Sequence, residues 1–255
     1  MAMALLLVAG LAALAAAALP AAAASATRQG AAGVGQAKGP PGEVAQLVQR
    51  FRAARRQAAR EFTCLITPAC ATDEGRWLDA LEAGRVALQG LAEHAGRGDA
   101  EAAYQRGLLG LEVAEGHAER RDLREGAQFP HTARVLNRRL QAEQREAERF
   151  LAMAAAAGHA EACFALAEHL AAQREPLPAA GLASHLYRCA VQGRAARDDL
   201  VGAAAVYARM RGALDPRDPL LVEAHALVHR GLKPERPWRL VEPEQAEALR
   251  RIAAP

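Results

Sequence analysis

Aromatic side chains are scarce in this 255-residue chain, at 4% of the residues, although hydrophobic residues as a whole make up 51%. Helices filled with alanine and leucine bury less area per residue than an aromatic core does, so stability must come from many close contacts between helices. The shortage also leaves few stacking platforms for sugars or nucleobases. With 24% charged residues, the composition is that of a folded domain with a sizeable core.

Lysine is also rare: it occurs only at Lys38 and Lys233, so arginine carries nearly all of the positive charge. The formal net charge is +3, and the chain has no long block of one sign of the kind that marks nucleic-acid-binding tails. The arginine excess, together with the alanine excess, is more simply explained by a GC-rich genome than by phosphate recognition. We therefore predict no nucleic-acid partner.

Serine is nearly absent beyond residue 26, where Ser184 is the only one. A serine triad needs a nucleophile on a strained elbow, and a Ser-x-x-Lys site needs a nearby lysine; neither pattern surrounds Ser184. A glycosidase would need two placed carboxylates in an aromatic-lined cleft, for which the sequence offers no pattern. We predict no catalytic residues, no cofactor and no enzymatic activity.

The first 26 residues carry no charged side chain, and they are apolar between positions 5 and 19. Pro20 follows this run, and the small residues at 24–26 fit a signal-peptide cleavage site. The segment predicts a cleavable signal over 1–26 and a periplasmic or secreted protein; an uncleaved signal that anchors the chain in a membrane is the alternative. Residues 27–42, rich in glycine, alanine and proline, are expected to form a flexible linker.

Export predicts that the four cysteines form disulfide bonds, because thiols outside the cytoplasm usually pair. Cys163 and Cys189 lie equally far from Pro176, in the middle of a turn between two predicted helices, so an antiparallel hairpin would bring them together. Cys64 and Cys70 would then form the other pair. Neither pair has the Cys-x-x-Cys spacing of a zinc or redox site, so we expect two disulfides and no metal.

Residues 43–62 are typical of a basic amphipathic helix, with apolar residues at helical intervals and arginines over much of the remaining surface. These arginines are Arg50, Arg52, Arg55, Arg56 and Arg60. The segment is either an N-terminal capping helix with a solvated face, or a membrane contact that binds anionic lipid or a cell-envelope polymer.

Two ten-residue segments repeat one motif: GDAEAAYQRG at 98–107 and GHAEACFALA at 158–167. Three positions of the two copies correspond, namely Ala102 with Ala162, Tyr104 with Phe164, and Gly107 with Ala167. The small residues allow two helices to approach closely, and the aromatic ring fills the groove between them. A long helix is predicted over 132–157, ahead of the second copy, and a last helix over 244–252.

These motifs resemble the Sel-one-like repeat, a relative of the tetratricopeptide repeat, over residues 98–193. In that family the three positions are typically alanine, tyrosine and glycine. The resemblance implies an all-α fold, a right-handed α-solenoid of antiparallel helix pairs, in which residues 43–255 form one repeat domain with capping helices on both sides. A further unit over 197–231 keeps only Tyr207 and helical patterning. An array of this family implies protein or peptide binding on its concave face.

Residues 117–131 are an insertion where the family has a short turn, and arginines gather in and beside it. They are Arg120, Arg121, Arg124, Arg134, Arg138 and Arg139. The segment is either a longer hairpin whose arginines pair with neighbouring glutamates, or a recognition loop whose arginine forks bind the carboxylates of an acidic peptide or partner protein.

His225 and His229 are one helical turn apart and face the same side, with Glu223 nearby. No third ligand is evident, and the glutamate that follows the first histidine of a zinc hydrolase motif is missing.

From all these features we predict an exported, non-enzymatic scaffold that binds a protein or peptide in the cell envelope. The first alternative is an envelope-binding module that uses the basic helix, and the second is a metal-dependent hydrolase that uses this histidine pair.

Overall fold

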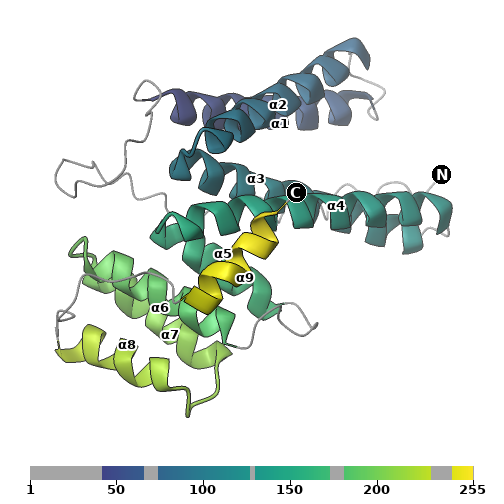
Figure 1. The fold of residues 1–255 in the computed structure, drawn as a ribbon. Helices are drawn as coiled ribbons and strands as arrows, with labels where there is room; N and C mark the ends of the chain where they lie inside the picture. Colours follow the sequence, from purple (N-terminus) through teal and green to yellow (C-terminus); the bar gives the residue numbers. More distant parts are fainter. Residues whose placement is uncertain (1–41, 66–73, 127–129, 173–180, 231–242, 255) are drawn as a thin grey trace. The chain divides into compact units, whose positions relative to one another are not determined.

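Helices make up nearly all of the chain that a computed structural model describes, namely residues 42–65, 74–126, 130–172, 181–230 and 243–254. No strand occurs in these ranges, so the predicted all-α class is confirmed for them. None of the helices in these ranges is long and apolar enough to cross a membrane. The helices are α1 (Glu43–Leu65), α2 (Glu74–Gly96), α3 (Ala100–Gly126), α4 (Pro130–Ala156), α5 (Ala160–Ala172), α6 (Leu182–Ala195), α7 (Leu200–Ala213), α8 (Pro219–Arg230) and α9 (Pro243–Ala253) (Figure 1). The predicted signal peptide and linker lie outside the described residues, apart from Gly42.

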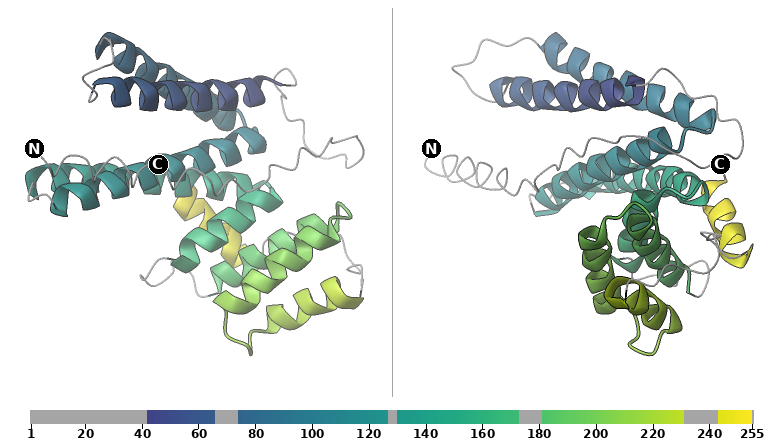
Figure 2. Two further views of the ribbon diagram at one scale, coloured as in Figure 1. Left: turned by 180° about the vertical axis from the view of Figure 1, so that it is seen from behind. Right: turned by 90° about the vertical axis from the view of Figure 1, so that its left-hand side faces the viewer.

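Successive helices pack side by side in pairs: α1 with α2, α3 with α4, α5 with α6, and α7 with α8. Each pair also contacts the next one, through α2 and α3, through α4 and α5, and through α6 with both α7 and α8. The last helix does not extend this series, because α9 (yellow) packs on α4, as Figure 2 shows from two sides, and it also touches α6. A final helix was predicted at nearly the same residues, and this prediction is confirmed.

The insertion at 117–131 lengthens a helix pair. α3 runs on to Gly126 and α4 begins at Pro130, so each of the two helices has 27 residues. The sequence HAERRDLREG at 117–126 is rich in good helix formers, and proline is favoured at the start of a helix, where its missing N–H is not needed. The segment is thus a longer helical hairpin, as one alternative predicted, but the ion pairs with glutamates that this alternative expected are not found at Arg121, Arg134, Arg138 or Arg139 among the described residues. Most of the segment is helix and not a loop, and partner binding by its arginines stays a prediction.

The turns that join successive pairs repeat one backbone arrangement. Gly98 and Gly158, just beyond α2 and α4, have φ angles of 88° and 85°. The next N–H, of Asp99 or His159, donates to the carbonyl oxygen five residues earlier, at 3.2 and 3.0 Å. This bond closes the helix end and needs the left-handed conformation, which glycine adopts without steric cost. The same two side chains then accept from the backbone N–H three residues ahead, at 3.1 and 3.2 Å, and cap the next helix.

A third copy of this turn joins α6 to α7, and the sequence did not reveal it. Asp198 has a φ of 60°, the N–H of Asp199 donates to the carbonyl oxygen five residues earlier at 3.0 Å, and its carboxylate caps the N–H three residues ahead at 2.8 Å. Aspartate tolerates the left-handed region better than most residues, so it replaces the glycine here. Aligned on this turn, Tyr207 stands where the other units have Gly107 and Ala167. The unit thus keeps the turn and lacks the aromatic residue of the motif, so the prediction that it keeps only Tyr207 is wrong.

Small residues bring the helices into close contact, as the motif predicts. A Cβ atom at Gly107 would lie 2.6 Å from the Cγ atom of Leu151 and 3.0 Å from the carbonyl oxygen of Ala147, both on α4. At Gly193 of α6, a Cβ atom would lie 2.5 Å from the Cβ atom of Ala160 on α5. The core consists largely of alanine and leucine, so these close approaches replace the aromatic contacts that the chain lacks.

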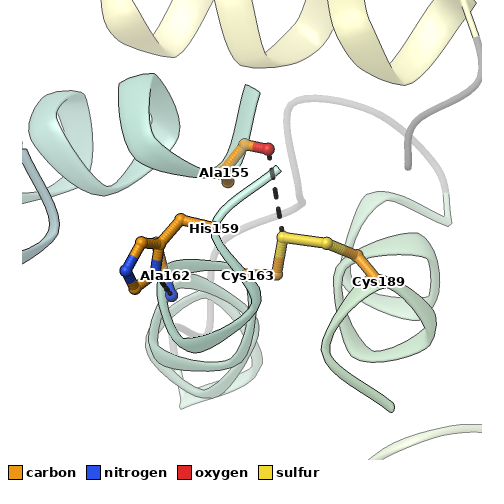
Figure 3. The surroundings of a disulfide bond; sticks show 5 residues. All are labelled: Ala155, His159, Ala162, Cys163 and Cys189. Atoms are coloured by element: carbon orange, nitrogen blue, oxygen red, sulfur yellow. Dashed lines mark hydrogen bonds between the residues drawn. A yellow bond between two sulfur atoms is a disulfide. The ribbon is translucent and has the colours of Figure 1, made fainter. Parts of the chain in front are cut away.

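Cys163 of α5 and Cys189 of α6 form the disulfide bond that the sequence predicts (Figure 3). Their Cα atoms are 6.1 Å apart, and both residues are fully buried between the two helices. A buried disulfide indicates that the protein folds in an oxidising environment. Of the second predicted pair, Cys64 is half-buried in the last turn of α1, and Cys70 lies outside the described residues.

Candidate partner-binding site

The long α3–α4 pair extends past the helix that follows it. His169, in the last turn of α5, lies beside Glu148 of α4, with 2.8 Å between Nε2 and Oε1. α5 has only 13 residues, so residues 130–144 of α4 continue beyond its end (Figure 1). The inserted residues thus expose a length of helix surface that a pair of ordinary length would not have.

A pocket of about 460 Å³ lies on this surface, and we call it the α3–α4 pocket. Its apolar lining comes from Leu111, Ala114, Ala118 and Leu140. Its polar lining comes from Glu115, Arg121, Asn137, Gln141, Gln144 and His169. Polar side chains thus make up more of this lining than apolar ones, whereas ligand sites are usually more apolar, so a segment bound here would be held chiefly by hydrogen bonds and charge.

Three side-chain amides form a row on the α4 side of the α3–α4 pocket. Asn137, Gln141 and Gln144 are spaced by four and three residues, so they share one helix face. The Oδ1 atom of Asn137 accepts a hydrogen bond from Arg121 at 3.3 Å, whereas the amides of Gln141 and Gln144 bond to none of the described residues. An amide both donates and accepts, as a peptide group does, so this row is suited to hydrogen bonding with an extended backbone. No sequence pattern singled out these residues, although their helical spacing is visible in the chain.

The arginines predicted to bind a partner do not all lie on this face. Arg121 lines the pocket and pairs with Asp122 at 2.7 Å. Arg134, Arg138 and Arg139 are exposed and form no ion pair with any described residue. At 100° per residue, Arg134 lies about 60° and Arg138 about 100° from Asn137 around α4, whereas Arg139 lies about 200° away, on the opposite face. The side chains of Arg120 and Arg124 lie outside the described residues.

The basic helix α1 is packed into the fold. Its apolar side is buried and packs with α2, through Val48, Phe51, Ala54 and Ala58. All five of its arginines are exposed, and one of them, Arg55, pairs with Glu112 of α3 at 2.8 Å. The other four, Arg50, Arg52, Arg56 and Arg60, form no ion pair within the described ranges. Most of its apolar side is buried, although Phe62 is 50% exposed, so α1 would meet a membrane or polymer chiefly with its charge.

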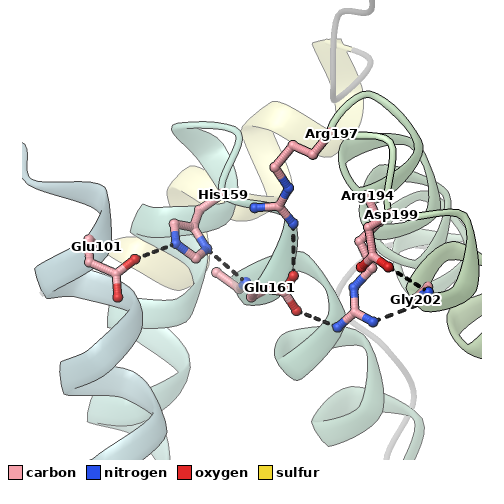
Figure 4. Close-up of polar contacts among 8 residues, drawn as sticks. Glu101, His159, Glu161, Arg194, Arg197, Asp199 and Gly202 are labelled. Atoms are coloured by element: carbon pink, nitrogen blue, oxygen red, sulfur yellow. Dashed lines mark hydrogen bonds and ion pairs between the residues drawn. The ribbon is translucent and has the colours of Figure 1, made fainter. Parts of the chain in front are cut away.

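Polar side chains join three successive units near the turns (Figure 4). The Nδ1 atom of His159 caps α5, so its proton lies on Nε2, which donates to Glu101 of α3 at 2.9 Å. Glu161 accepts hydrogen bonds from Arg194 and from Arg197, the latter at 2.8 Å. Arg194 also donates to a backbone carbonyl of α7 at 3.2 Å. Because these groups bond mainly to one another, we interpret the cluster as a structural connection between the units.

Tyr104 belongs to the same cluster. Its ring is stacked on the imidazole of His159, with 4.6 Å between the ring centroids and 25° between the planes. Burial raises the pKa of the Tyr104 hydroxyl, and the carboxylates of Glu161 and Glu101 raise it further. The phenol therefore stays protonated, which agrees with a packing role at the motif position that the sequence identified.

Ser184 makes a structural hydrogen bond. Its hydroxyl is buried and donates to the Oδ2 atom of Asp218 at 2.6 Å, while the other carboxylate oxygen of Asp218 caps α8. The bond joins the first turn of α6 to the start of α8. It gives Ser184 a carboxylate partner in place of the imidazole that a serine nucleophile needs.

The Glu101–His159 contact leads to a pH-dependent prediction. The hydrogen bond from His159 lowers the pKa of Glu101 below its usual 4.5, although burial acts in the opposite direction. Because the folded-state pKa is the lower one, the ionised carboxylate stabilises the fold above pH 4.5, and this contribution is lost as the pH falls through the folded-state pKa. The thermal midpoint of the wild type should therefore fall more steeply between about pH 5 and pH 3 than that of Glu101→Gln.

Thermal denaturation followed by circular dichroism measures both slopes. Glu119→Gln is the matched control, because Glu119 is an exposed glutamate of the same helix that contacts no described ionisable group. It should follow the wild type at every pH. Equal slopes for the wild type and Glu101→Gln would contradict the prediction.

Comparison with known proteins gives no match: no family model, no curated protein and no solved structure corresponds to the chain. The resemblance to the Sel-one-like repeat therefore rests on the motifs at 98–107 and 158–167 and on the turns that precede them.

Proposed function

We propose that the protein is an exported scaffold of Sel-one-like repeats that binds an acidic, extended segment of a partner protein in the α3–α4 pocket. The observation that carries this proposal is the composition of that surface. Four apolar side chains lie beside two amides without described partners, and two exposed arginines without described ion pairs, Arg134 and Arg138, flank the amide row. The scaffold performs no reaction itself.

The repeated turns support the repeat assignment. The same 6→1 hydrogen bond and the same side-chain cap recur at Asp99, His159 and Asp199, each at the start of a new helix pair. Helix pairs that contact only their neighbours are the structural unit of a solenoid. We therefore propose that the four pairs form a right-handed α-solenoid, with α9 packed across the second helices of two pairs as its C-terminal closure.

Export is supported by the disulfide between Cys163 and Cys189. Disulfides persist in the periplasm and outside the cell, and they are rare in the cytoplasm. Together with the apolar, uncharged segment over 1–26, this supports a location in the cell envelope or in the secreted fraction.

The size of the pocket limits the partner segment to a few residues. From Arg134 to Gln144, α4 rises by about 15 Å, which is the length of about four or five residues of extended chain. The amides of Gln141 and Gln144 would bond to the peptide groups, and Arg134 and Arg138 would attract acidic side chains at one end of the segment.

Charge reversal tests the proposed surface. We expect Arg134→Glu/Arg138→Glu to weaken the binding of an acidic octapeptide by at least about 10-fold, because it replaces attraction by repulsion at two flanking positions. The probe is a fluorescein-labelled octapeptide selected by the wild-type protein from a random phage-displayed library. Fluorescence anisotropy measures the dissociation constants, and the selected sequences themselves should be enriched in aspartate and glutamate.

The matched control is Arg139→Glu/Arg60→Glu, which changes the net charge by the same amount at exposed positions away from the pocket. It should change the affinity by less than about 3-fold. Selected peptides without acidic residues, or equal losses in the two double variants, would rule out the α3–α4 pocket as an acidic-peptide site.

The exposed arginines of α1 favour a second candidate function, electrostatic binding to anionic lipid or an envelope polymer. Because most of its apolar side is buried, such binding would depend chiefly on charge, and it would weaken strongly as the salt concentration rises. Co-sedimentation with phosphatidylglycerol vesicles at low and high salt tests it. Salt-sensitive binding that Arg50→Glu/Arg56→Glu abolishes and Arg134→Glu/Arg138→Glu preserves would favour this function over peptide binding.

A further inference from the structure

Two imidazole rings lie next to each other on α8. The ring centroids of His225 and His229 are 4.4 Å apart, and the ring planes are inclined by 40°. Both side chains are exposed and therefore accessible to solvent. The carboxylate of Glu223, also on α8, forms an ion pair with Arg188, with 3.4 Å between Oε1 and Nη2. It is therefore directed to Arg188 and not to the two imidazoles.

A tyrosine of the adjacent helix holds one of the two imidazoles. The hydroxyl of Tyr207, on α7, lies 3.1 Å from the Nδ1 atom of His225, and its ring meets His229 edge-on, with 5.8 Å between centroids. Tyr207 is itself only 9% exposed, so its hydroxyl position is fixed by packing. When Nδ1 of His225 donates to this oxygen, the lone pair of Nε2 is free to bind an ion.

In that tautomer the pair matches a metal-binding histidine with its outer partner, since metal-bound imidazoles are oriented by a hydrogen bond from the other ring nitrogen. Histidines at i and i+4 place two nitrogen ligands on one side of a helix. Beside them lies a pocket of about 460 Å³ that Tyr207 and His229 line, and it leaves room for water as further ligands. No group of three or more metal-binding side chains occurs among the described residues, so the protein would supply two ligands only.

We propose that His225 and His229 bind one divalent ion of the copper, nickel and zinc class, with water in the remaining positions and Tyr207 as the positioning residue. Imidazole is a preferred ligand of these ions, and two nitrogen ligands bind Cu²⁺ most tightly by the general affinity order. Arg211 lines the same pocket, and its positive charge lowers the affinity of any cation there. The ion adds a binding function that peptide recognition at the α3–α4 pocket does not require.

Copper titration of the full chain, prepared without a histidine tag, tests the site. We expect one Cu²⁺ per chain in isothermal titration calorimetry, and an electron paramagnetic resonance spectrum with hyperfine splitting from two nitrogen ligands. His225→Ala and His229→Ala should each weaken binding by at least about 10-fold, because one of two protein ligands is lost. Tyr207→Phe should weaken it by about 3-fold to 10-fold and leave the stoichiometry unchanged.

His185→Ala is the control, since His185 belongs to another helix and should bind no ion. A second measurement does not depend on copper: Zn²⁺ should raise the thermal midpoint of the wild type and of His185→Ala, and leave that of His225→Ala/His229→Ala unchanged. Copper affinity in this double variant equal to that of the wild type would overturn the proposal, as would an affinity in His185→Ala reduced as much as in His225→Ala.

Discussion

Replacing both Cys163 and Cys189 by alanine is expected to lower the free energy of unfolding by about 3.5 kcal/mol, the largest loss that we predict for a covalent change. The disulfide joins residues 26 apart in sequence, so it removes conformational freedom from the unfolded chain. Both residues are fully buried, and the smaller alanine side chains also give up part of their packing between α5 and α6. Urea denaturation at equilibrium measures the loss.

Reduction of the wild type supplies the control for this experiment. Dithiothreitol should lower the urea midpoint of the wild type to nearly that of Cys163→Ala/Cys189→Ala, since it breaks the same constraint without removing atoms. The reductant should change the midpoint of the double variant much less. If the double variant responded to the reductant as strongly as the wild type does, the stabilising bond would have to lie elsewhere in the chain.

The pairing of these cysteines was predictable because it depends on local topology alone. Two helices joined by a short connection run antiparallel, and positions at equal distances from the turn then face each other. The same holds for the turns at Gly98 and Gly158, where one residue with a left-handed conformation ends a helix and the next residue caps another. Such features involve neighbours in sequence, so they can be read from the chain.

The third turn, between α6 and α7, could not be predicted in this way. At Asp198 and Asp199 the left-handed residue is not glycine, so the strongest sequence signal of the turn is missing. The hydrogen bonds are nevertheless the same as in the other two turns. Recognising the unit requires the backbone angles, because aspartate only tolerates the conformation that glycine prefers.

Contacts between units could not be predicted either. Glu101 and His159 are 58 residues apart, and they meet because a turn places the histidine at the start of α5, beside α3. Arg106 is a further example: it is 5% exposed and pairs with Glu146 at 2.8 Å, although nothing in the neighbouring sequence marks it as buried. The partner of a charged residue depends on which helices pack together, and this information is not local.

Of the candidate site, the sequence predicts some of the residues but not the helix face on which each of them lies. The sequence marks the arginines near 117–139, but only the helix directions show that Arg139 points away from the face that carries Arg134. The α3–α4 pocket exists because α5 is shorter than α4. The difference in length was visible as an insertion, yet its consequence depends on the insertion forming helix, which lengthens the pair and leaves part of α4 beyond the end of α5.

A single methyl group should have opposite effects at two glycines of α3. Gly107→Ala is expected to destabilise the fold by about 2 kcal/mol, because overpacking a close helix contact costs more than the higher helix propensity of alanine returns. The new Cβ atom would lie 2.6 Å from Leu151, and it would also lie 3.0 Å from the backbone carbonyl of Ala147, which cannot rotate away. The two helices would have to separate where the motif brings them closest.

Gly116→Ala is the matched control, because a Cβ atom at Gly116 meets no atom within 4 Å. Here the substitution gains helix propensity without a clash, so it should stabilise the fold by about 0.5–1 kcal/mol. Urea denaturation of the two variants separates the steric from the conformational contribution, since the chemical change and the helix are the same. If Gly107→Ala were as stable as Gly116→Ala, the close approach of α3 to α4 would not be what selects glycine at this motif position. An equal loss of stability in both variants would instead mean that α3 needs the flexibility of glycine at these positions and not its small size. The packing argument for the repeat motif would then be wrong.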